Sequence, residues 1–302
     1  MSRRGWLLFA SMCVIWGIPY LLIKVAVRDI TPSMLVLART ALGAALLLPI
    51  AAFRGQLRAV LRRPVPLVAF AGIEIALPWI LLGTAEQHIS SSLTGLLLAG
   101  VPLVATVLAW TGGRERLAFH SGVGLLLGVL GVASILGLDV QGASAAGVVE
   151  IGAVAVCYAV GPVILQRWLA DLPPLGVIGA SLGVTALAYV PITAVAGVGR
   201  APSGAVVGSV LALAVVCTAL AFVVFFALIA EIGPVRATVI TYVNPAVAGA
   251  LGVVVLDERF TVGMGVGFAL VLAGSVLATR PPHPPAASGA AALDPACEPG
   301  SL

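Results

Sequence analysis

Ionisable side chains inside long apolar stretches are candidate functional residues, because a charge there is expensive to keep. Glu74, in "FAGIEIALPWILLG", lies about seven residues into an apolar run, roughly 10 Å deep at about 1.5 Å per residue. A carboxyl group near the middle of such a run suits a proton carrier or a counter-charge for an amine, and we take Glu74 as the proton-coupling candidate. A structural carboxylate paired with Arg39 is the alternative.

Two cations and a second acid accompany Glu74. Arg39 lies about six residues from the start of the second apolar run, and Lys24 closes the first run on the same side. Both suit a vestibule, and Arg39 could bind either a substrate carboxylate or a protein carboxylate. Glu86 ends the run that holds Glu74 and could form an ion pair with either cation. Snorkelling to the interface is the alternative for Lys24 and Glu86.

The segment "TYVNPAVAG" places Thr241, Tyr242 and Asn244 before a proline inside another apolar run. Pro245 cannot donate a hydrogen bond to the Thr241 carbonyl, so a kink is expected. The polar side chains could then bind a zwitterionic substrate, although Asn244 could instead satisfy the loosened backbone. A proline also precedes Trp79, whose ring offers a wall for a cation or an aromatic group.

Composition decides where these residues must act. The chain has 302 residues, of which 61% are hydrophobic and 9% are charged, and the mean hydropathy is +1.16. Too little polar material remains to coat a water-facing surface, so this is an integral membrane protein in contact with a lipid bilayer. The basic residues are scattered between apolar runs, which argues against a nucleic-acid partner. The four cysteines show no metal or redox spacing, and neither a metal nor another cofactor is expected.

About 20 mainly apolar residues are needed to span the hydrocarbon core. Ten runs of about that length are predicted as membrane helices: Trp6–Ala26, Ser33–Phe53, Leu67–Thr84, Leu93–Trp110, Gly122–Leu138, Gly147–Gln166, Leu175–Ala196, Val206–Ile229, Ala237–Leu256 and Val262–Thr279. The expected fold class is an all-α integral membrane protein. Residues 281–302, rich in proline and alanine, are expected to form a disordered cytoplasmic tail.

An internal repeat organises these runs. The segment "GGRERLAFHSGVG" at 112–124 returns 143 residues later as "VLDERFTVGMGVG" at 255–267, which makes Glu115 equivalent to Glu258. Pro102 corresponds in the same way to Pro245. We interpret these four residues as structural. Each repeat, 1–138 and 139–280, holds five predicted spans, and the odd number makes the second repeat inverted.

The charges agree with that topology. With the N-terminus inside, eleven of the sixteen basic residues fall on the inner side and four on the outer side. Both termini are therefore expected in the cytoplasm. Fifteen of the basic residues are arginine, which is typical of a GC-rich bacterial genome, so a multi-pass protein of the bacterial cytoplasmic (inner) membrane is expected.

Small residues recur at helix-packing distance in the fifth and tenth predicted spans. Gly124-xxx-Gly128 and Gly263-xxx-Gly267 have the spacing that lets membrane helices approach closely. The spacing fits packing of these spans within one chain. It also fits a homodimer formed through them.

The sequence resembles the EamA-type members of the drug/metabolite transporter superfamily. The residues that carry the resemblance are Trp16-Gly17, Lys24, Arg39 and the two repeated segments that run from Pro102 to Glu115 and from Pro245 to Glu258. The likeness covers nearly the whole chain. It implies ten helices in two inverted five-helix repeats, cytoplasmic termini and a central substrate cavity. It also implies export of amino acids or other small metabolites.

The function predicted from the sequence is secondary transport of a small polar metabolite (an amino acid, amine or drug-like solute), in the direction of export, by alternating access. A membrane-embedded enzyme is an alternative, but the histidines His88, His120 and His283 fall in loops or the tail, and HExxH and GxSxG motifs are absent. A passive channel is another alternative, although two unequal halves do not make a ring. Without a Walker loop, ATP is not the expected direct energy source.

Overall fold

The computed structural model describes residues 1–112, 118–137 and 144–279, and within them regular structure is helical. The predicted corner residue Glu115, the repeat boundary at 138/139 and the tail 281–302 lie outside the described residues. The first half contains α1 Arg3–Ile15, α2 Pro19–Ala26, α3 Pro32–Phe53, α4 Leu57–Leu61, α5 Pro64–Phe70, η1 Ala71–Ala76, α6 Leu77–His88, α7 Ser91–Leu98, α8 Val101–Thr111 and α9 Phe119–Gly137. The second half contains α10 Ala145–Trp168, α11 Pro174–Ala196, α12 Gly204–Ala214, η2 Val215–Leu220, α13 Ala221–Ile232, α14 Pro234–Ala237, α15 Ile240–Leu256 and α16 Val262–Ala278.

Local sequence explains where many of these helices begin. Hydroxyl groups accept a hydrogen bond from a main-chain N–H of the first turn in α1, α3, α7, α12 and α16. The capping residues are Ser2, Thr31, Ser90, Ser203 and Thr261. Such caps satisfy N–H groups that have no partner inside the helix.

The described helices fit a membrane protein that crosses the bilayer many times. Eight of them, some built from consecutive shorter helices, are long and apolar enough to span, from Arg3–Ala26 to Gly204–Ile232. The apolar helices α15 and α16 are shorter, at 17 residues each, which is close to the lower limit of about 17 residues for a span. The structure therefore supports a multi-pass helical fold, and the count of ten remains a prediction.

Several predicted spans are interrupted. The first is divided into α1 and α2 at Trp16–Ile18, and the third widens into the π-helix η1 before α6. A second π-helix, η2, occupies the corresponding place in the second half, since the repeat displacement of 143 residues places Glu74 opposite Cys217. The expected kink at Pro245 is shifted, because α15 continues through this proline and the interruption lies before Ile240.

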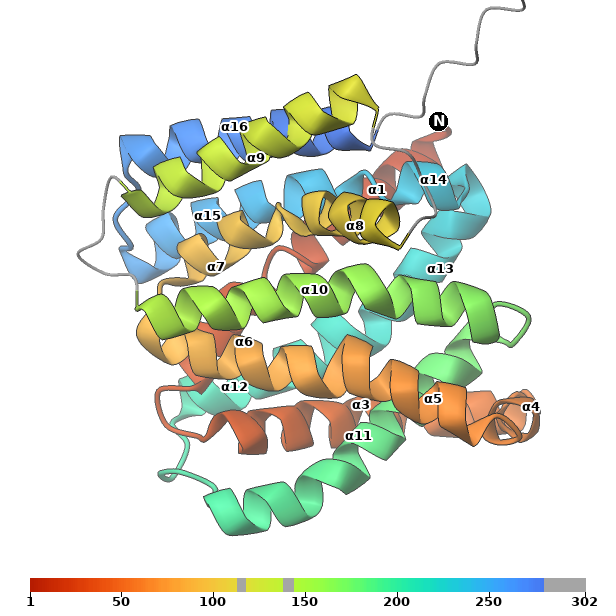
Figure 1. Ribbon diagram of the computed structural model, residues 1–302. Coiled ribbons are helices and arrows are strands. Elements are labelled where there is room, and N and C mark those ends of the chain that lie inside the picture. The colour runs from red at the N-terminus through yellow and green to blue at the C-terminus, as the bar shows by residue number, and fades with distance from the viewer. Residues whose placement is uncertain (113–117, 138–143, 280–302) are drawn as a thin grey trace, which may run out of the picture.

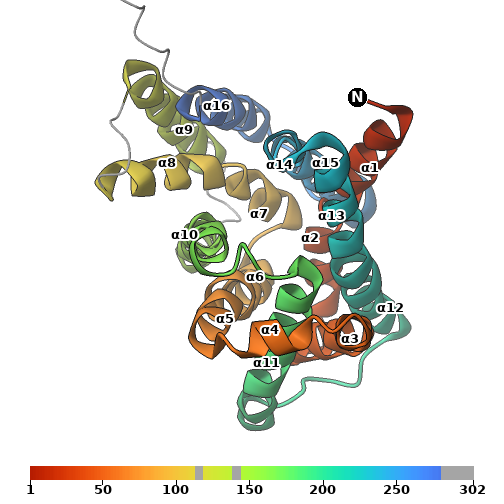
Figure 2. The same cartoon turned by 90° about the vertical axis from the view of Figure 1, so that its right-hand side faces the viewer.

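The two halves are intertwined. The most extensive packing joins α16 to α9, α11 to α3, α10 to α6, α15 to α7 and α12 to α2, and each of these pairs takes one helix from each half. Figure 1 shows α9 and α16 side by side at one edge and α3 and α11 at the other. In Figure 2, α10 lies between α7 above it and α5 and α6 below it. Residues buried between these helix pairs therefore contact side chains of both halves.

Glycines bring α9 and α16 into backbone contact. A Cβ on Gly124 would lie 2.6 Å from the Gly274 carbonyl oxygen, and one on Gly267 would lie 2.5 Å from that of Gly131. Gly128 faces Leu103 of α8. The glycine spacing of the fifth and tenth predicted spans is thus used inside one chain, and the homodimer through these spans remains a prediction.

The helix ends form two opposite faces. The N-terminus and the end of α16 lie on one face, with α4 and α14 (Figure 1). On this face Arg63 forms a two-pronged ion pair with Asp171 at 2.7 Å. On the opposite face, Asp29 accepts a hydrogen bond from the Ser203 N–H at 2.9 Å. The two halves are therefore joined at both faces.

Candidate functional site

Arg39 is a buried cation at the contact between the two halves. Its side chain is 7% exposed, and its Nε donates a hydrogen bond to Thr218 Oγ1 at 2.9 Å. Arg39 comes from α3, whereas Thr218 belongs to η2 of the second half. Within the described residues, no carboxylate forms an ion pair with Arg39 and no hydrogen bond reaches its Nη1 or Nη2. A buried guanidinium with free donors can bind an anionic ligand.

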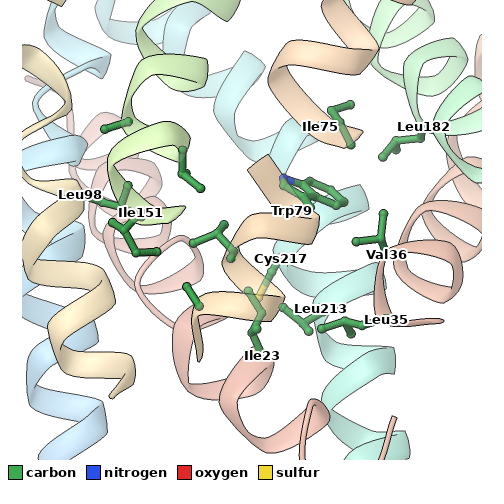
Figure 3. Packing of buried hydrophobic residues seen from close by; sticks show 14 of the residues in the cluster. Ile23, Leu35, Val36, Ile75, Trp79, Leu98, Ile151, Leu182, Leu213 and Cys217 are labelled. Atoms are coloured by element: carbon green, nitrogen blue, oxygen red, sulfur yellow. The ribbon is translucent and has the colours of Figure 1, made fainter. Parts of the chain in front are cut away.

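Trp79 covers one face of this guanidinium. The Cζ of Arg39 lies 3.6 Å from the centre of the indole, which is a cation–π contact. Trp79 is itself buried, and Figure 3 shows it on α6 among apolar side chains that include Val36 and Cys217. The stack fixes the plane of the guanidinium, so its remaining N–H groups point in defined directions.

Hydroxyl and phenol groups surround the pair. The Thr218 hydroxyl donates to the Leu213 carbonyl at 2.8 Å, which satisfies a main-chain acceptor five residues earlier in the widened helix. Tyr158 of α10 interacts with the Trp79 indole and lies in electrostatic range of both Arg39 and Glu74. The arrangement puts hydrogen-bonding groups from both halves around one cation.

Glu74 lies in η1 and does not pair with Arg39 within the described residues. Its Oε2 is buried without a hydrogen-bond partner among the described residues. The carboxylate packs against Gly161 of α10, where any Cβ would collide with it. Pro78 explains the local widening, because it has no N–H for the Glu74 carbonyl four residues earlier. The Tyr189 hydroxyl donates to the Ala76 carbonyl at 2.8 Å and so holds the end of η1.

Lys24 and Glu86 meet through the main chain. Lys24 Nζ donates to the carbonyl oxygens of Glu86 at 2.5 Å and Ile89 at 2.8 Å, at the end of α6. The Glu86 side chain is 0% exposed, so it does not snorkel to the interface. No ion pair joins the two side chains within the described residues. Both residues lie at the end of α6, and neither forms a hydrogen bond with Arg39, Trp79 or Thr218 among the described residues.

Glu258 caps a helix of the other half. Its carboxylate accepts hydrogen bonds from the N–H groups of Ser91 and Ser92, both at 2.8 Å, at the start of α7. Burial alone would raise the pKa of Glu258, but the hydrogen bonds from Ser92 and Ser91 outweigh it and hold this pKa below its ordinary value. The charged corner therefore ties α7 to the loop between α15 and α16.

The polar residues before Pro245 form hydrogen bonds with neighbours other than the Arg39 stack. The Thr241 hydroxyl donates to the Thr238 carbonyl, and the Tyr242 hydroxyl contacts that of Thr279 near the end of α16. Asn244 is buried, and with its amide oriented to suit its neighbours, Nδ2 donates to the carbonyls of Ile240 at 3.0 Å and Cys13 at 3.1 Å. None of the three contacts the Arg39 stack through a hydrogen bond within the described residues.

A groove of about 360 Å³ between α7, α15 and α16 does not fit a polar ligand. Its lining is apolar: Leu96, Ala246, Gly249, Ala250, Val253, Val254, Phe260 and Phe268. This lining suits hydrocarbon, so the groove is not the candidate site.

The sequence predicted Arg39, Trp79 and Glu74 as site residues, which stays a prediction, and it did not predict the residues that contact them. Thr218 and Gly161 have no chemical signature that separates them from other small residues of apolar helices. The repeat provides one signal, because the displacement that pairs Glu74 with Cys217 leads directly to the neighbouring Thr218.

Comparison with known protein families identifies the family of this chain and its two repeats. The model of the EamA-like transporter family matches the chain twice, over residues 3–137 and 146–280. The matched segments are displaced by 143 residues, as the sequence repeat predicts. The resemblance and the presence of two repeats are thereby confirmed, whereas their inverted orientation remains a prediction.

Individual relatives are distant. A curated protein of Archaeoglobus fulgidus, described as "Uncharacterized transporter", is 21% identical over 278 residues, covering 92% of this chain and 99% of that protein. A solved structure described as "Crystal structure of protein" has 22% identity and a TM-score of 0.65, and the match covers 92% of this chain and 97% of that one. At this level of identity, the structural likeness shows the fold alone.

Proposed function

Because the chain belongs to the EamA-like transporter family and is a multi-pass membrane transporter, we propose that it exports a small polar metabolite bearing a carboxylate by alternating access. The observation that carries this proposal is the Arg39 guanidinium, buried, stacked on Trp79 and free of any protein carboxylate within the described residues. A substrate carboxylate would satisfy the free N–H groups.

The proposed substrate class includes amino acids. Glu74 offers a second charge of opposite sign, and Tyr158 is in electrostatic range of both Glu74 and Arg39. A zwitterion could place its carboxylate near Arg39 and its ammonium group toward Glu74. The Oε2 atom of Glu74 is buried and has no hydrogen-bond partner among the described residues, which supports the proton-coupling role that we propose for this residue.

Alternating access is supported by the way the two halves pack. The most extensive helix pairs each join the halves, and α3 with α11, α7 with α15 and α9 with α16 join equivalent places in the two repeats. This pairing is that of a pseudo-twofold arrangement, and an inverted repeat lets one half rock against the other around a shared site. We also propose ten spans from the apolar runs, cytoplasmic termini from the distribution of basic residues, and a bacterial inner membrane from the arginine-rich composition. A homodimer, if formed, would use faces of α9 and α16 other than their mutual contact.

The test is counterflow of labelled amino acids, amines and nucleosides in proteoliposomes, with and without a pH gradient. For a carboxylate substrate, Arg39→Gln should lower transport affinity about 10- to 100-fold, because hydrogen bonds to charged groups are worth about 1.5–3 kcal/mol. Arg28→Gln removes an exposed arginine and serves as the control. Equal affinity in wild type and Arg39→Gln would contradict the site, and absence of exchange with every solute would contradict the transport proposal.

A further inference from the structure

Glu86 is a fully buried carboxyl group near the end of α6. It is 0% exposed, and both carboxyl oxygens lack a hydrogen-bond partner among the described residues. An ionised carboxylate in this position would lose its hydration and gain no hydrogen bond in return. Such a charge costs several kcal/mol, so the neutral form suits this conformation.

The nearby cation is engaged with the backbone. Lys24 lies in electrostatic range of the Glu86 carboxyl group, but its Nζ donates to the carbonyl oxygens of Glu86 and Ile89. These carbonyls belong to the end of α6, where a positive charge stabilises the helix. Lys24 therefore has two alternative partners within reach, the helix end and the carboxylate.

The segment 86–92 joins several parts of the molecule and is called here the α6–α7 junction. Lys24 holds it to α2, and Glu258 holds its Ser91 and Ser92 N–H groups to the second half. Ile89 packs on Gly147 at the start of α10, where a Cβ would lie 2.9 Å from Ile89 Cγ2. A change in the Lys24 contact would alter how the halves meet on this face.

We propose that Glu86 binds a proton in this conformation, and that its release to the aqueous phase draws the Lys24 ammonium from the helix-end carbonyls to the carboxylate. The new ion pair removes the cap on α6 and frees the α6–α7 junction from α2. If the chain is the transporter proposed above, on which this last consequence rests, proton release at Glu86 opens this face to solute.

Other titratable groups lie on the elements that pack against α6 and in the loop that caps α7. They are Tyr20 and Lys24 of α2, Arg39 of α3, Glu74 of η1, His88 of α6 itself, Glu150, Cys157 and Tyr158 of α10, and Glu258 in the loop before α16. Lys24 and Glu258 act on Glu86 most directly, with opposite signs.

The first test does not require a substrate. Purified protein in lipid is titrated with pH while its infrared spectrum is recorded, and the protonated-carboxyl stretch is compared between wild type, Glu86→Gln and Glu74→Gln. We expect a titrating band that Glu86→Gln removes and Glu74→Gln leaves in place. A spectrum unchanged by Glu86→Gln would overturn the proton site, whether or not the protein transports any solute.

The second test measures hydrogen exchange of the main-chain amides of the α6–α7 junction, with wild type and variants always compared at the same pH. At alkaline pH, the Ser91–Leu93 amides of wild type should exchange at least several-fold faster than those of Glu86→Gln, whereas Lys24→Met, which lacks the contact with the α6 carbonyls, should exchange fast at both pH values. At acidic pH, wild type and Glu86→Gln should agree. Equal exchange at both pH values would overturn the proposed release of the junction. Failure of counterflow with normal infrared and exchange results would contradict the transport function instead.

Discussion

Arg39 and Glu74 each depend on uncharged residues that lie next to them in the interior. Arg39 keeps its charge in the interior through a hydrogen bond to Thr218 and a stack on Trp79, which together occupy only part of its donor set. Glu74 fits beside α10 because position 161 carries no side chain. The chemistry of both charged groups therefore depends on neutral neighbours from the other half.

Gly161→Ala is predicted to destabilise the protein by about 1–3 kcal/mol, because its Cβ collides with the Glu74 carboxylate. In a Glu74→Ala background the same substitution should be nearly neutral, which a double-mutant cycle of thermal unfolding measures. Gly152→Ala on the same helix meets open space and is the matched control. An equal cost of Gly161→Ala in both backgrounds would rule out this contact as the cause.

At the scale of helices, the ends are stabilised by side chains from distant elements. Lys24 of α2 contacts the last carbonyls of α6, and Glu258 contacts the first N–H groups of α7. A cation at a helix C-terminus and an anion at an N-terminus are each favourable for the helix dipole. The consecutive helices α6 and α7 thus end and begin beside charges of the correct sign.

Glu258→Gln should remove a charge-assisted cap and destabilise the protein by about 0.5–2 kcal/mol at neutral pH. The pKa of Glu258 is lowered in the folded state, so its contribution is present above the unfolded pKa of about 4.3 and is lost as pH falls through the lower folded value. Thermal unfolding of wild type and Glu258→Gln should therefore converge in acid. Glu231→Gln, at an exposed glutamate, is the control, and a pH-independent difference between wild type and Glu258→Gln would argue against a charge effect.

At the scale of the whole molecule, polar side chains join the two halves at both faces. The Arg63–Asp171 ion pair is exposed, with side chains 42% and 63% accessible, and water screens such pairs so that they contribute little to stability. The opposite face combines the half-buried Glu258 cap with the Asp29–Ser203 hydrogen bond. Polar contacts between the halves are therefore present at both faces.

The topology predicts opposite accessibility for two exposed arginines. Arg58 lies on the face of the N-terminus and Arg200 on the other, so Arg200→Cys should react with an impermeant thiol reagent in spheroplasts. Arg58→Cys should react only after lysis. Labelling of both variants from the same side would exclude this topology, and the wild-type chain measures the background from native cysteines.

The sequence was sufficient for the repeat and the membrane class, because both follow from long apolar runs and from matching residues at one displacement. It did not predict the π-helices, since η2 contains no proline to mark it. The sequence also did not predict the contacts of Lys24 with main-chain carbonyls or of Glu74 with Gly161. They depend on how distant helices approach, which periodicity does not encode.

The widened turn at Ala71–Ala76 also sets the angular phase of everything that follows it in the third span. One residue corresponds to about 100° of rotation around an α-helix. The i→i+5 turn holds about one residue more than an α-helical turn. Regular α-helical winding of the same residues would therefore rotate Trp79 away from the Arg39 guanidinium, although the sequence and its hydropathy would be unchanged. The aromatic wall and the cation are therefore aligned by the number of residues in one turn as much as by their identity.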